Sequence, residues 1–278
     1  MIRIENLSKH YKEIHALKGI SLHVHPGELF AYLGPNGAGK TTTIRILTGL
    51  TTHNSGDVYL NGFNIKKETL DAKRQCGLVP QSINLDQELT VYENLDVHAR
   101  LFHMPVRKRA EKIQELLNYI DLADRKKTLA KQLSGGMKRR VMIARSMVHS
   151  PTILFLDEPT VGLDAAIRRR IWALIKKIQQ AGTTIFLTTH YIEEAEFLAD
   201  RVAFLDEGNI AAIDTPQKLM DKLGFWAIDR VMNNEMETLY FRTRENAKAY
   251  INSQHESFTL RRVNLEDAFL ALTGKKVK

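Results

Sequence analysis

The sequence of 278 residues predicts an α/β protein built around a parallel sheet, and two features indicate that fold. Compact apolar runs of strand length, such as Leu29–Leu33 and Thr152–Leu156, alternate with amphipathic helical segments, as in strands joined by helical crossovers. A glycine-rich loop joins the first of these runs to a helix that begins at Lys40. Around this core we expect an N-terminal antiparallel β subdomain, an inserted helical subdomain and a small C-terminal α/β appendage.

The N-terminal 60 residues indicate short strands separated by turns, which is typical of sheet structure. The run Leu29–Leu33 is predicted to be a buried strand, and the loop after it leads into a helix over Lys40–Leu50. Asp57–Leu60 is predicted to be a further strand, because the turn dipeptide Asn61-Gly62 follows it.

Residues 88–150 form the predicted helical subdomain. Thr90–Glu93 has the spacing of a capping box and opens an apolar-periodic stretch through His103. A second helix is predicted over Arg107–Ile120, and a third follows Gly136. No strand pattern interrupts this block, so we expect it to be an insertion in the α/β core.

The sheet pattern returns after residue 150. Thr152–Leu156 and Thr183–Leu187 are predicted buried strands, and a helix over Asp164–Gln180 lies between them. Val202–Leu205 and Ile210–Ile213 then predict a terminal hairpin.

Thr215-Pro216 is typical of a helix start, with Thr as the N-cap and Pro at the first helical position. From Phe225 onward the pattern is mixed strand and helix, and it closes with an apolar-periodic helix over Leu265–Leu272. We therefore expect a main domain over residues 1–220 and an appendage over residues 221–278.

Composition excludes several classes of protein. The single Cys76 allows no intrachain disulfide and favours a reducing cytoplasm. The N-terminus is charged from Arg3 onward, so we expect no signal peptide, and no apolar run reaches the roughly 18 residues of a membrane helix. Lys and Arg number 40 against 32 Asp and Glu, a net charge of +8 that nucleic acid, an anionic membrane or a phosphate-bearing ligand would each explain.

The loop after Leu33 fits the pattern G-x-x-x-x-G-K-[ST] in its expected strand–loop–helix context. Glycines allow backbone N–H groups to form an anion cradle, and the following helix directs its positive end at the phosphates. A plain glycine-rich turn with a surface lysine is the alternative, which the context disfavours. The predicted nucleotide-binding residues are Gly34, Pro35, Asn36, Gly37, Ala38, Gly39, Lys40, Thr41 and Thr42.

Asp157 and Glu158 follow directly after a predicted buried strand. The carboxyl ends of parallel strands are where α/β proteins bind ligands. Asp157, together with the Thr41 hydroxyl, would hold Mg²⁺, and Glu158 would act as the general base toward a water. A charged turn at the strand exit is the alternative, and the phosphate loop upstream favours the functional interpretation.

A second glycine cluster, Ser134-Gly135-Gly136, precedes an apolar-periodic helix. The hydroxyl, the backbone donors and the helix N-terminus would together bind another anion. One nucleotide needs one cradle, so this cluster would serve a second copy of the chain. An N-capped helix without a ligand is an equally good interpretation of these residues alone.

These three motifs, in this order and spacing, resemble the ATP-binding subunit of an ABC transporter over about residues 1–215. The resemblance implies an ABC-type P-loop ATPase that uses ATP and Mg²⁺. It implies that Tyr11 stacks on adenine, and that Gln81 contacts Mg²⁺ and the attacking water. It also implies that Asp164 lies in a loop crossing a dimer interface, and that His190 contacts the γ-phosphate.

The resemblance further implies a head-to-tail homodimer or heterodimer, with each ATP between the phosphate loop of one subunit and Ser134, Gly135 and Gly136 of the other. It implies a separate transmembrane permease and a peripheral position on the cytoplasmic face of the membrane. Met137 followed by Lys-Arg-Arg, and the ending Leu265–Gly274, resemble the branch that serves drug and polysaccharide exporters. Import is the alternative within transport, and a soluble ABC ATPase acting on ribosomes or DNA is the alternative outside it.

The basic excess is local. The segment from Arg100 to Ser150 holds 13 basic and 4 acidic residues, a net charge of +9, while the rest of the chain sums to −1. In the family this subdomain faces the permease at the membrane surface, where each well-placed charge contributes up to about 1 kcal/mol on an anionic leaflet. Solvated helix faces are the alternative, and nucleic acid is not expected as a partner.

Overall fold

The computed structural model describes residues 1–232, 235–254 and 257–274. At its centre is a six-stranded sheet in the order β10-β9-β3-β8-β7-β6. All neighbouring pairs are parallel except β10 with β9, which is antiparallel at the edge. The strands are β3 (Leu29–Leu33), β6 (Cys76–Val79), β7 (Ile153–Asp157), β8 (Thr184–Thr189), β9 (Arg201–Asp206) and β10 (Asn209–Asp214). The predicted parallel core and terminal hairpin are confirmed.

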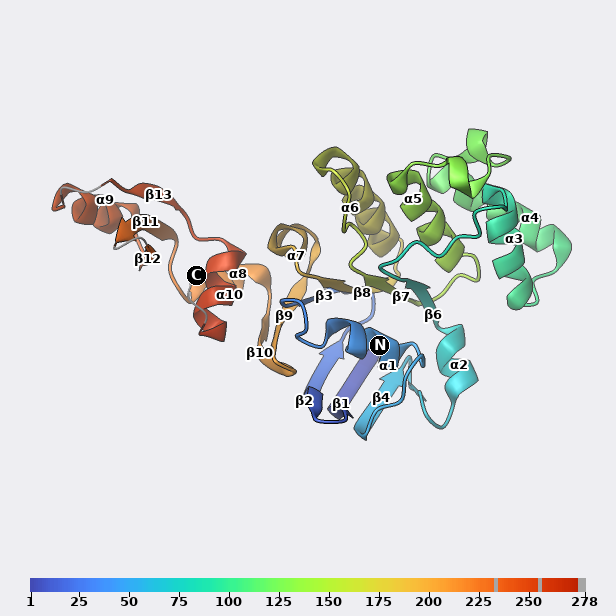
Figure 1. Cartoon of the computed structure of the whole chain (residues 1–278), viewed down its shortest axis with the longest axis horizontal. Helices are drawn as coiled ribbons and strands as arrows, with labels where there is room; N and C mark the ends of the chain where they lie inside the picture. The colour runs from blue at the N-terminus through green and yellow to red at the C-terminus, as the bar shows by residue number, and fades with distance from the viewer. Residues whose placement is uncertain (233–234, 255–256, 275–278) are drawn as a thin grey trace.

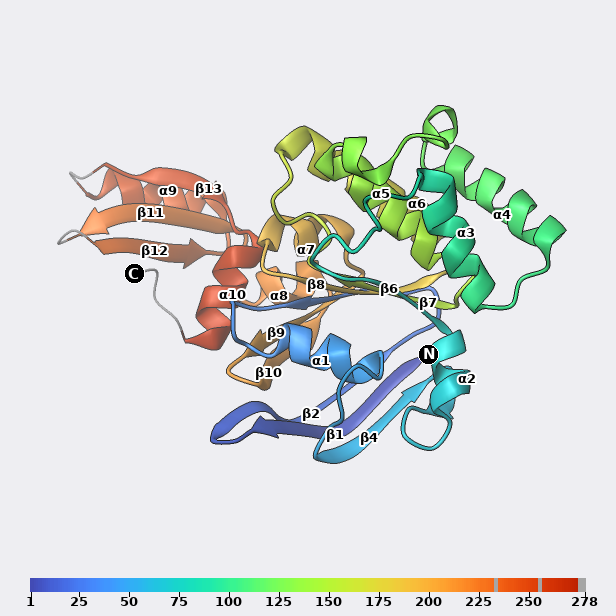
Figure 2. The same cartoon turned by 45° about the vertical axis from the view of Figure 1, so that its right-hand side comes forward.

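Helices cover one face of this sheet, and α1 (Lys40–Leu47) with an antiparallel sheet covers the other (Figures 1 and 2). Every residue of β3, β7 and β8 is buried for that reason. Alternate residues face opposite sides: Phe155 packs in the cluster that contains α1, and Leu154 packs in the cluster that contains the helical subdomain. Helix α1 ends before the predicted Leu50, because Gly49 adopts a positive φ of 66°.

The antiparallel sheet has the order β2-β1-β4-β5. Its strands are β1 (Ile2–Tyr11), β2 (Ile14–Val24), β4 (Ser55–Leu60) and β5 (Phe63–Asn64), and α2 (Thr69–Arg74) follows. The strands β1 and β2 are 10 and 11 residues long, so the prediction of short strands was wrong for this pair. Register shifts within the pair, including one between Ile4 and Leu7, break up the apolar alternation that marks a long strand.

The helical subdomain contains α3 (Val91–Leu101), α4 (Val106–Tyr119) and α5 (Gly135–Ser146), with 3₁₀ turns at Ala123–Arg125 and Ala130–Gln132. The predicted capping box is present: Thr90 accepts from the Glu93 backbone, and the Glu93 side chain accepts from Thr90. The only β pairing of this block among the described residues is a single bridge between Thr90 and Leu129. The insertion is therefore helical, as predicted.

Three helices complete the main body: α6 (Ala165–Gln180), α7 (Ile192–Leu198) and α8 (Pro216–Asp221), the last capped by Thr215 as predicted. Beyond it lie β11 (Trp226–Met232), β12 (Glu235–Phe241), α9 (Arg244–Asn252) and β13 (Thr259–Arg262), which form a three-stranded antiparallel sheet with one helix. Figure 1 shows this unit beside the core. The last helix, α10 (Leu265–Thr273), returns to the core, where Phe269 packs with Leu33 and Phe204. The boundary at residue 221 stays a prediction.

Among the described residues, no helix combines the length and apolar character needed to cross a membrane.

Candidate nucleotide site

The phosphate loop connects β3 to α1, and two of its glycines are required by close backbone contacts. Gly39 has a φ of 111°, and a Cβ there would lie 2.6 Å from the carbonyl oxygen of Ala16. A Cβ at Gly34 would lie 2.3 Å from the carbonyl oxygen of Leu205. Neither position accepts a side chain without moving main chain, so the predicted glycine pattern follows from packing as well as from anion binding.

A cavity of about 230 Å³ opens at this loop. Its lining includes Asn36, Gly37 and residues 39–42 of the predicted loop, together with Gln81 and Glu158. Residues 14–16 at the start of β2 also line the cavity, and sequence analysis did not identify them.

Tyr11, the predicted adenine partner, lies at the end of β1 and is 42% exposed. It does not line this cavity, and Lys9 Nζ lies 4.7 Å from the centre of its ring. Its register partner Ile14 does line the cavity, so the β1–β2 hairpin ends beside the phosphate loop. The adenine role of Tyr11 stays a prediction.

Lys40 is the first residue of α1 and is only 4% exposed. Its Nζ donates hydrogen bonds to the carbonyl oxygens of Gly34 at 2.8 Å and Pro35 at 3.1 Å. It also lies 3.3 Å from Glu158 Oε1. Three ammonium protons thus have three oxygen partners, which holds the charge at the mouth of the loop.

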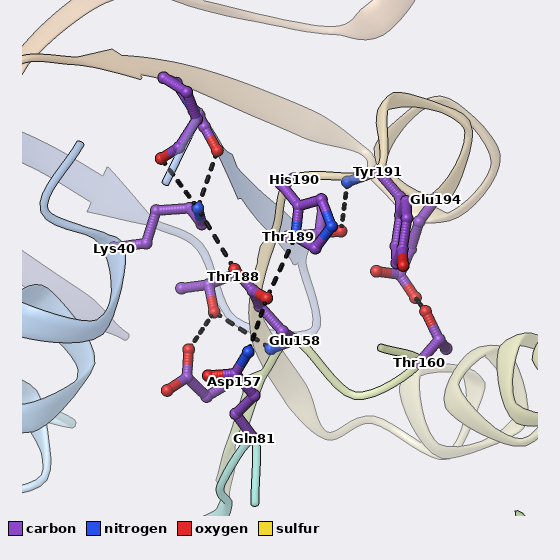
Figure 3. Close-up of polar contacts among 12 residues, drawn as sticks. Lys40, Gln81, Asp157, Glu158, Thr160, Thr188, Thr189, His190, Tyr191 and Glu194 are labelled. Carbon is purple, nitrogen blue, oxygen red and sulfur yellow. Dashed lines mark hydrogen bonds and ion pairs between the residues drawn. The ribbon is translucent and has the colours of Figure 1, made fainter. Parts of the chain in front are cut away.

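Glu158 follows β7 in a left-handed conformation, with a φ of 47°. A non-glycine residue in this region costs about 1–3 kcal/mol and is typical of functional sites. Its Oε2 accepts a hydrogen bond from Gln81 Nε2 at 3.0 Å and lies 3.1 Å from His190 Nδ1 (Figure 3). The structure therefore brings Lys40, Gln81 and His190 to the Glu158 carboxylate. These three residues follow different elements of the core.

Asp157 is the last residue of β7 and is 6% exposed. Its Oδ1 accepts a hydrogen bond from Thr188 Oγ1 at 2.6 Å. Burial raises the pKa of Asp157, and the hydrogen bond from Thr188 offsets part of that effect. The carboxylate is thus held in a fixed rotamer beside Glu158.

The second glycine cluster lies elsewhere on the chain, at the start of α5. Ser134 is the N-cap, and its Oγ accepts from the Met137 backbone N–H at 3.3 Å. Ser134 and Gly135 are exposed, whereas Gly136 packs so closely that a Cβ would lie 2.4 Å from Ile167 Cγ2. Asp164 caps α6 through its side chain. None of these predicted residues lines the chain's own phosphate cavity.

The family model described as "ABC transporter" matches residues 17–161, more than half of the 278 residues. The match includes the phosphate loop, the second glycine cluster and the two adjacent carboxylates. The chain belongs to the ABC transporter family. It is the ATPase subunit of such a transporter, and its α/β fold with an antiparallel N-terminal sheet is that of an ABC ATPase.

This ABC ATPase is similar to two kinds of curated protein. It is 42% identical over 224 residues to the linearmycin resistance ATP-binding protein LnrL of Bacillus subtilis, covering 81% of this chain and 72% of the relative. It is 37% identical over 299 residues to the Nod factor export ATP-binding protein I of Cupriavidus metallidurans, covering 100% of this chain and 99% of the relative.

Solved structures agree with this assignment. The dimeric post-hydrolysis structure of the ATP-binding cassette MJ0796 with ADP and Pi superposes with a TM-score of 0.70 at 30% identity, covering 77% of this chain and 98% of that chain. The cbiO1 subunit from Clostridium perfringens superposes with a TM-score of 0.73 at 30% identity, covering 78% and 89%.

Sequence analysis of this ABC ATPase missed Glu194, which lies on α7 behind the site and is fully buried. Its Oε1 accepts hydrogen bonds from Thr160 Oγ1 at 2.8 Å and Trp172 Nε1 at 2.9 Å (Figure 3 shows Glu194 with Thr160). Burial raises the pKa of Glu194. The one available signal was its place four residues after His190, on the first helix turns that follow that histidine.

Proposed function

We propose that this ABC ATPase uses Glu158 as the general base and drives an export permease. The observation that supports the hydrolytic role is the convergence of Lys40, Gln81 and His190 on the Glu158 carboxylate. A carboxylate held beside the phosphate loop can orient a water and accept its proton. Lys40 and the N-terminus of α1 would offset the charge of the phosphates.

The two oxygens of Glu158 have different partners, which suggests a division of roles. Gln81 and His190 both hold Oε2, whereas Lys40 lies on Oε1. When ATP enters the cavity, we expect Lys40 to exchange this contact for phosphate oxygens. That exchange would leave Oε1 free to accept the proton of the attacking water. His190, which follows β8, would then meet the γ-phosphate.

The donor set fits Mg²⁺. Thr41 supplies a hydroxyl oxygen, Gln81 an amide oxygen and Asp157 a carboxylate, and hard oxygen ligands are those that Mg²⁺ prefers. Bound Mg²⁺ would neutralise charge on the phosphates; the residues named here would hold it.

We propose that the second cradle acts in a dimer. Ser134 and Gly135 are exposed and do not line the chain's own phosphate cavity, so a second copy can reach them. A Ser134→Arg variant should block hydrolysis and leave nucleotide binding by the monomer intact. Loss of both together would contradict a site shared between two subunits.

We propose export as the direction of transport and the cytoplasmic face of the membrane as the location. The support is the similarity to the Nod factor export and linearmycin resistance proteins, over nearly the full length in the first case. The partner would be a separate permease, which selects the substrate. In inside-out vesicles that carry the complex, external ATP should drive substrate inward; ATP-driven release would indicate import.

The hydrolytic proposal is tested by Glu158→Gln, with Glu193→Gln as the matched control because its carboxylate is 84% exposed on the neighbouring helix. General bases contribute about 10²–10⁴ in rate, so we expect ATP turnover to fall at least ~100-fold while ATP still binds. The control should hydrolyse ATP at the normal rate. A Glu158→Gln variant with normal turnover would show that another group is the base.

A further inference from the structure

Helix α5 holds the segment that carries Gln81. Arg139 Nη1 and Nη2 donate to the carbonyl oxygens of Pro80 and Gln81, each at 2.8 Å. Further along the same helix, Arg145 Nη1 donates to the carbonyl oxygen of Asn84 at 2.9 Å. Three main-chain carbonyls within residues 80–84 therefore accept hydrogen bonds from the guanidinium groups of one helix.

Arg139 is 3% exposed, which is unusual for a guanidinium. Burial lowers the pKa of Arg139, and the charges of Glu194 and Asp157 act in the opposite direction. A buried cation whose hydrogen bonds reach neutral carbonyls is more costly than an apolar side chain of similar size. The guanidinium group of arginine is a rigid planar fork of N–H donors that matches two adjacent carbonyls, and no other side chain has that shape.

Two hydrogen-bonded steps connect this arginine to the proposed base. The first is from the Arg139 guanidinium to the main chain of Gln81. The second is from Gln81 Nε2 to Glu158 Oε2, at 3.0 Å. Ser134, five residues earlier, is the N-cap of the same helix, and we place the cradle for the second subunit's ATP there.

We propose that Arg139 is a positioning residue that couples the Ser134 cradle to the Glu158 of the same chain. This inference rests on the proposed function. When α5 moves against the sheet, the fork carries the two carbonyls with it, and Gln81 moves relative to Glu158. A hydrogen bond of 3.0 Å is lost beyond about 3.5 Å, so a shift of roughly 0.5–1 Å is enough to release Glu158. Occupancy of one cradle would then set the activity of the other site.

Steady-state kinetics of Arg139→Ala and Arg139→Lys test the positioning role. Misplacement of a catalytic group by about 1 Å costs up to ~10²-fold, so we expect Arg139→Ala to lower kcat about 10- to 100-fold with an unchanged ATP Kd. Arg139→Lys should be intermediate, because an ammonium cannot match both carbonyls. Arg109→Ala is the control: this half-buried guanidinium of the same subdomain binds Asp96 and the Met104 carbonyl, so kcat should be unchanged. A normal kcat in Arg139→Ala would overturn the proposal.

A double variant tests whether Arg139 acts through Gln81. If it does, Arg139→Ala/Gln81→Ala should have the kcat of Gln81→Ala alone. Multiplicative losses would show that the two residues act independently and would overturn the coupling.

Amide hydrogen exchange separates this inference from the assignment of the base. In protein without nucleotide, Arg139→Ala should exchange faster than wild type over residues 80–85 and at the wild-type rate over α4. Unchanged exchange over residues 80–85 would refute the proposal that Arg139 holds this segment, whatever the role of Glu158. Normal turnover by Glu158→Gln would refute the base alone and leave the exchange result standing.

Discussion

Replacing Glu194 by alanine removes the acceptor of two buried hydrogen bonds at once. Thr160 Oγ1 and Trp172 Nε1 both donate to its Oε1, and Glu194 is fully buried. A buried donor left without a partner costs about 1–3 kcal/mol, so the two donors together predict a loss of roughly 2–6 kcal/mol in the free energy of unfolding. Glu194→Gln keeps an acceptor oxygen and removes a charge that burial disfavours, so it should cost no more than ~1 kcal/mol.

The assay is urea unfolding followed by far-ultraviolet circular dichroism, because Trp172 is itself one of the partners and its fluorescence would change locally. Glu196→Ala is a poor control, since Glu196 accepts from the Leu265 backbone; Glu193→Ala, which is exposed, is the suitable one. A loss of less than ~1 kcal/mol in Glu194→Ala would show that the two donors do not depend on this carboxylate. A Glu194→Gln variant as damaged as Glu194→Ala would contradict the role of the acceptor oxygen.

The same residue predicts a pH dependence. Because burial raises the pKa of Glu194 in the folded state above its unfolded value, the folded state binds the proton more tightly. The wild type should therefore gain stability relative to Glu194→Gln as the pH falls from neutral through the folded pKa. If the wild type instead lost stability relative to Glu194→Gln as the pH fell, the raised pKa of Glu194 would be contradicted.

Other regions give independent tests. Gly136→Ala would place a Cβ 2.4 Å from Ile167 Cγ2, an overpacking cost of about 1–3 kcal/mol in the free energy of unfolding that a second change, Ile167→Ala, should relieve. If Ile167→Ala did not restore the stability lost in Gly136→Ala, the strain would lie elsewhere than at Ile167. Burial raises the pKa of Cys76 from 9.0 to about 12, so at pH 8 its alkylation in native protein should be about 1,000-fold slower than in unfolded protein. Rapid native labelling would contradict that burial. If Tyr11 stacks on adenine, Tyr11→Ala should weaken ATP binding by about 1–3 kcal/mol, read from the Kd. An unchanged Kd would contradict the adenine role of Tyr11.

Much of the core was predictable because its signals are local. The run Leu29–Leu33 is apolar at every position because helices and a second sheet cover its two faces, and the observed strand has the predicted bounds. The phosphate loop follows from residue spacing over a single strand–loop–helix unit, and six of its nine predicted residues line one cavity, whereas Gly34, Pro35 and Ala38 do not. The convergence on Glu158 was not predicted from the residues, because Gln81 and His190 were identified only through the family resemblance; topology explains it, since parallel strand ends share one edge of the sheet.

The residues that were missed act through contacts distant in the sequence. Arg139 was interpreted as part of a basic excess, yet it donates to carbonyls 58 and 59 residues away. Its neighbour Arg140 donates to the Ile120 carbonyl at 2.7 Å, so part of the positive charge is structural. Glu194 lies among exposed acids on a short helix, and only the fold shows that it faces inward. Charge counting does not separate a solvated side chain from one that fills a buried hydrogen-bonding role.

The mass of Glu158→Gln in solution with ATP and Mg²⁺ tests the central claim most directly, because it depends on both the base and the shared site. If Glu158 is the base and each ATP lies between two subunits, size-exclusion chromatography with light scattering should find a dimer of two 31.7 kDa chains. Adding Ser134→Arg to the same chain should return it to the monomer while ATP still binds. A monomeric Glu158→Gln, or a dimer that persists with Ser134→Arg, would contradict the account.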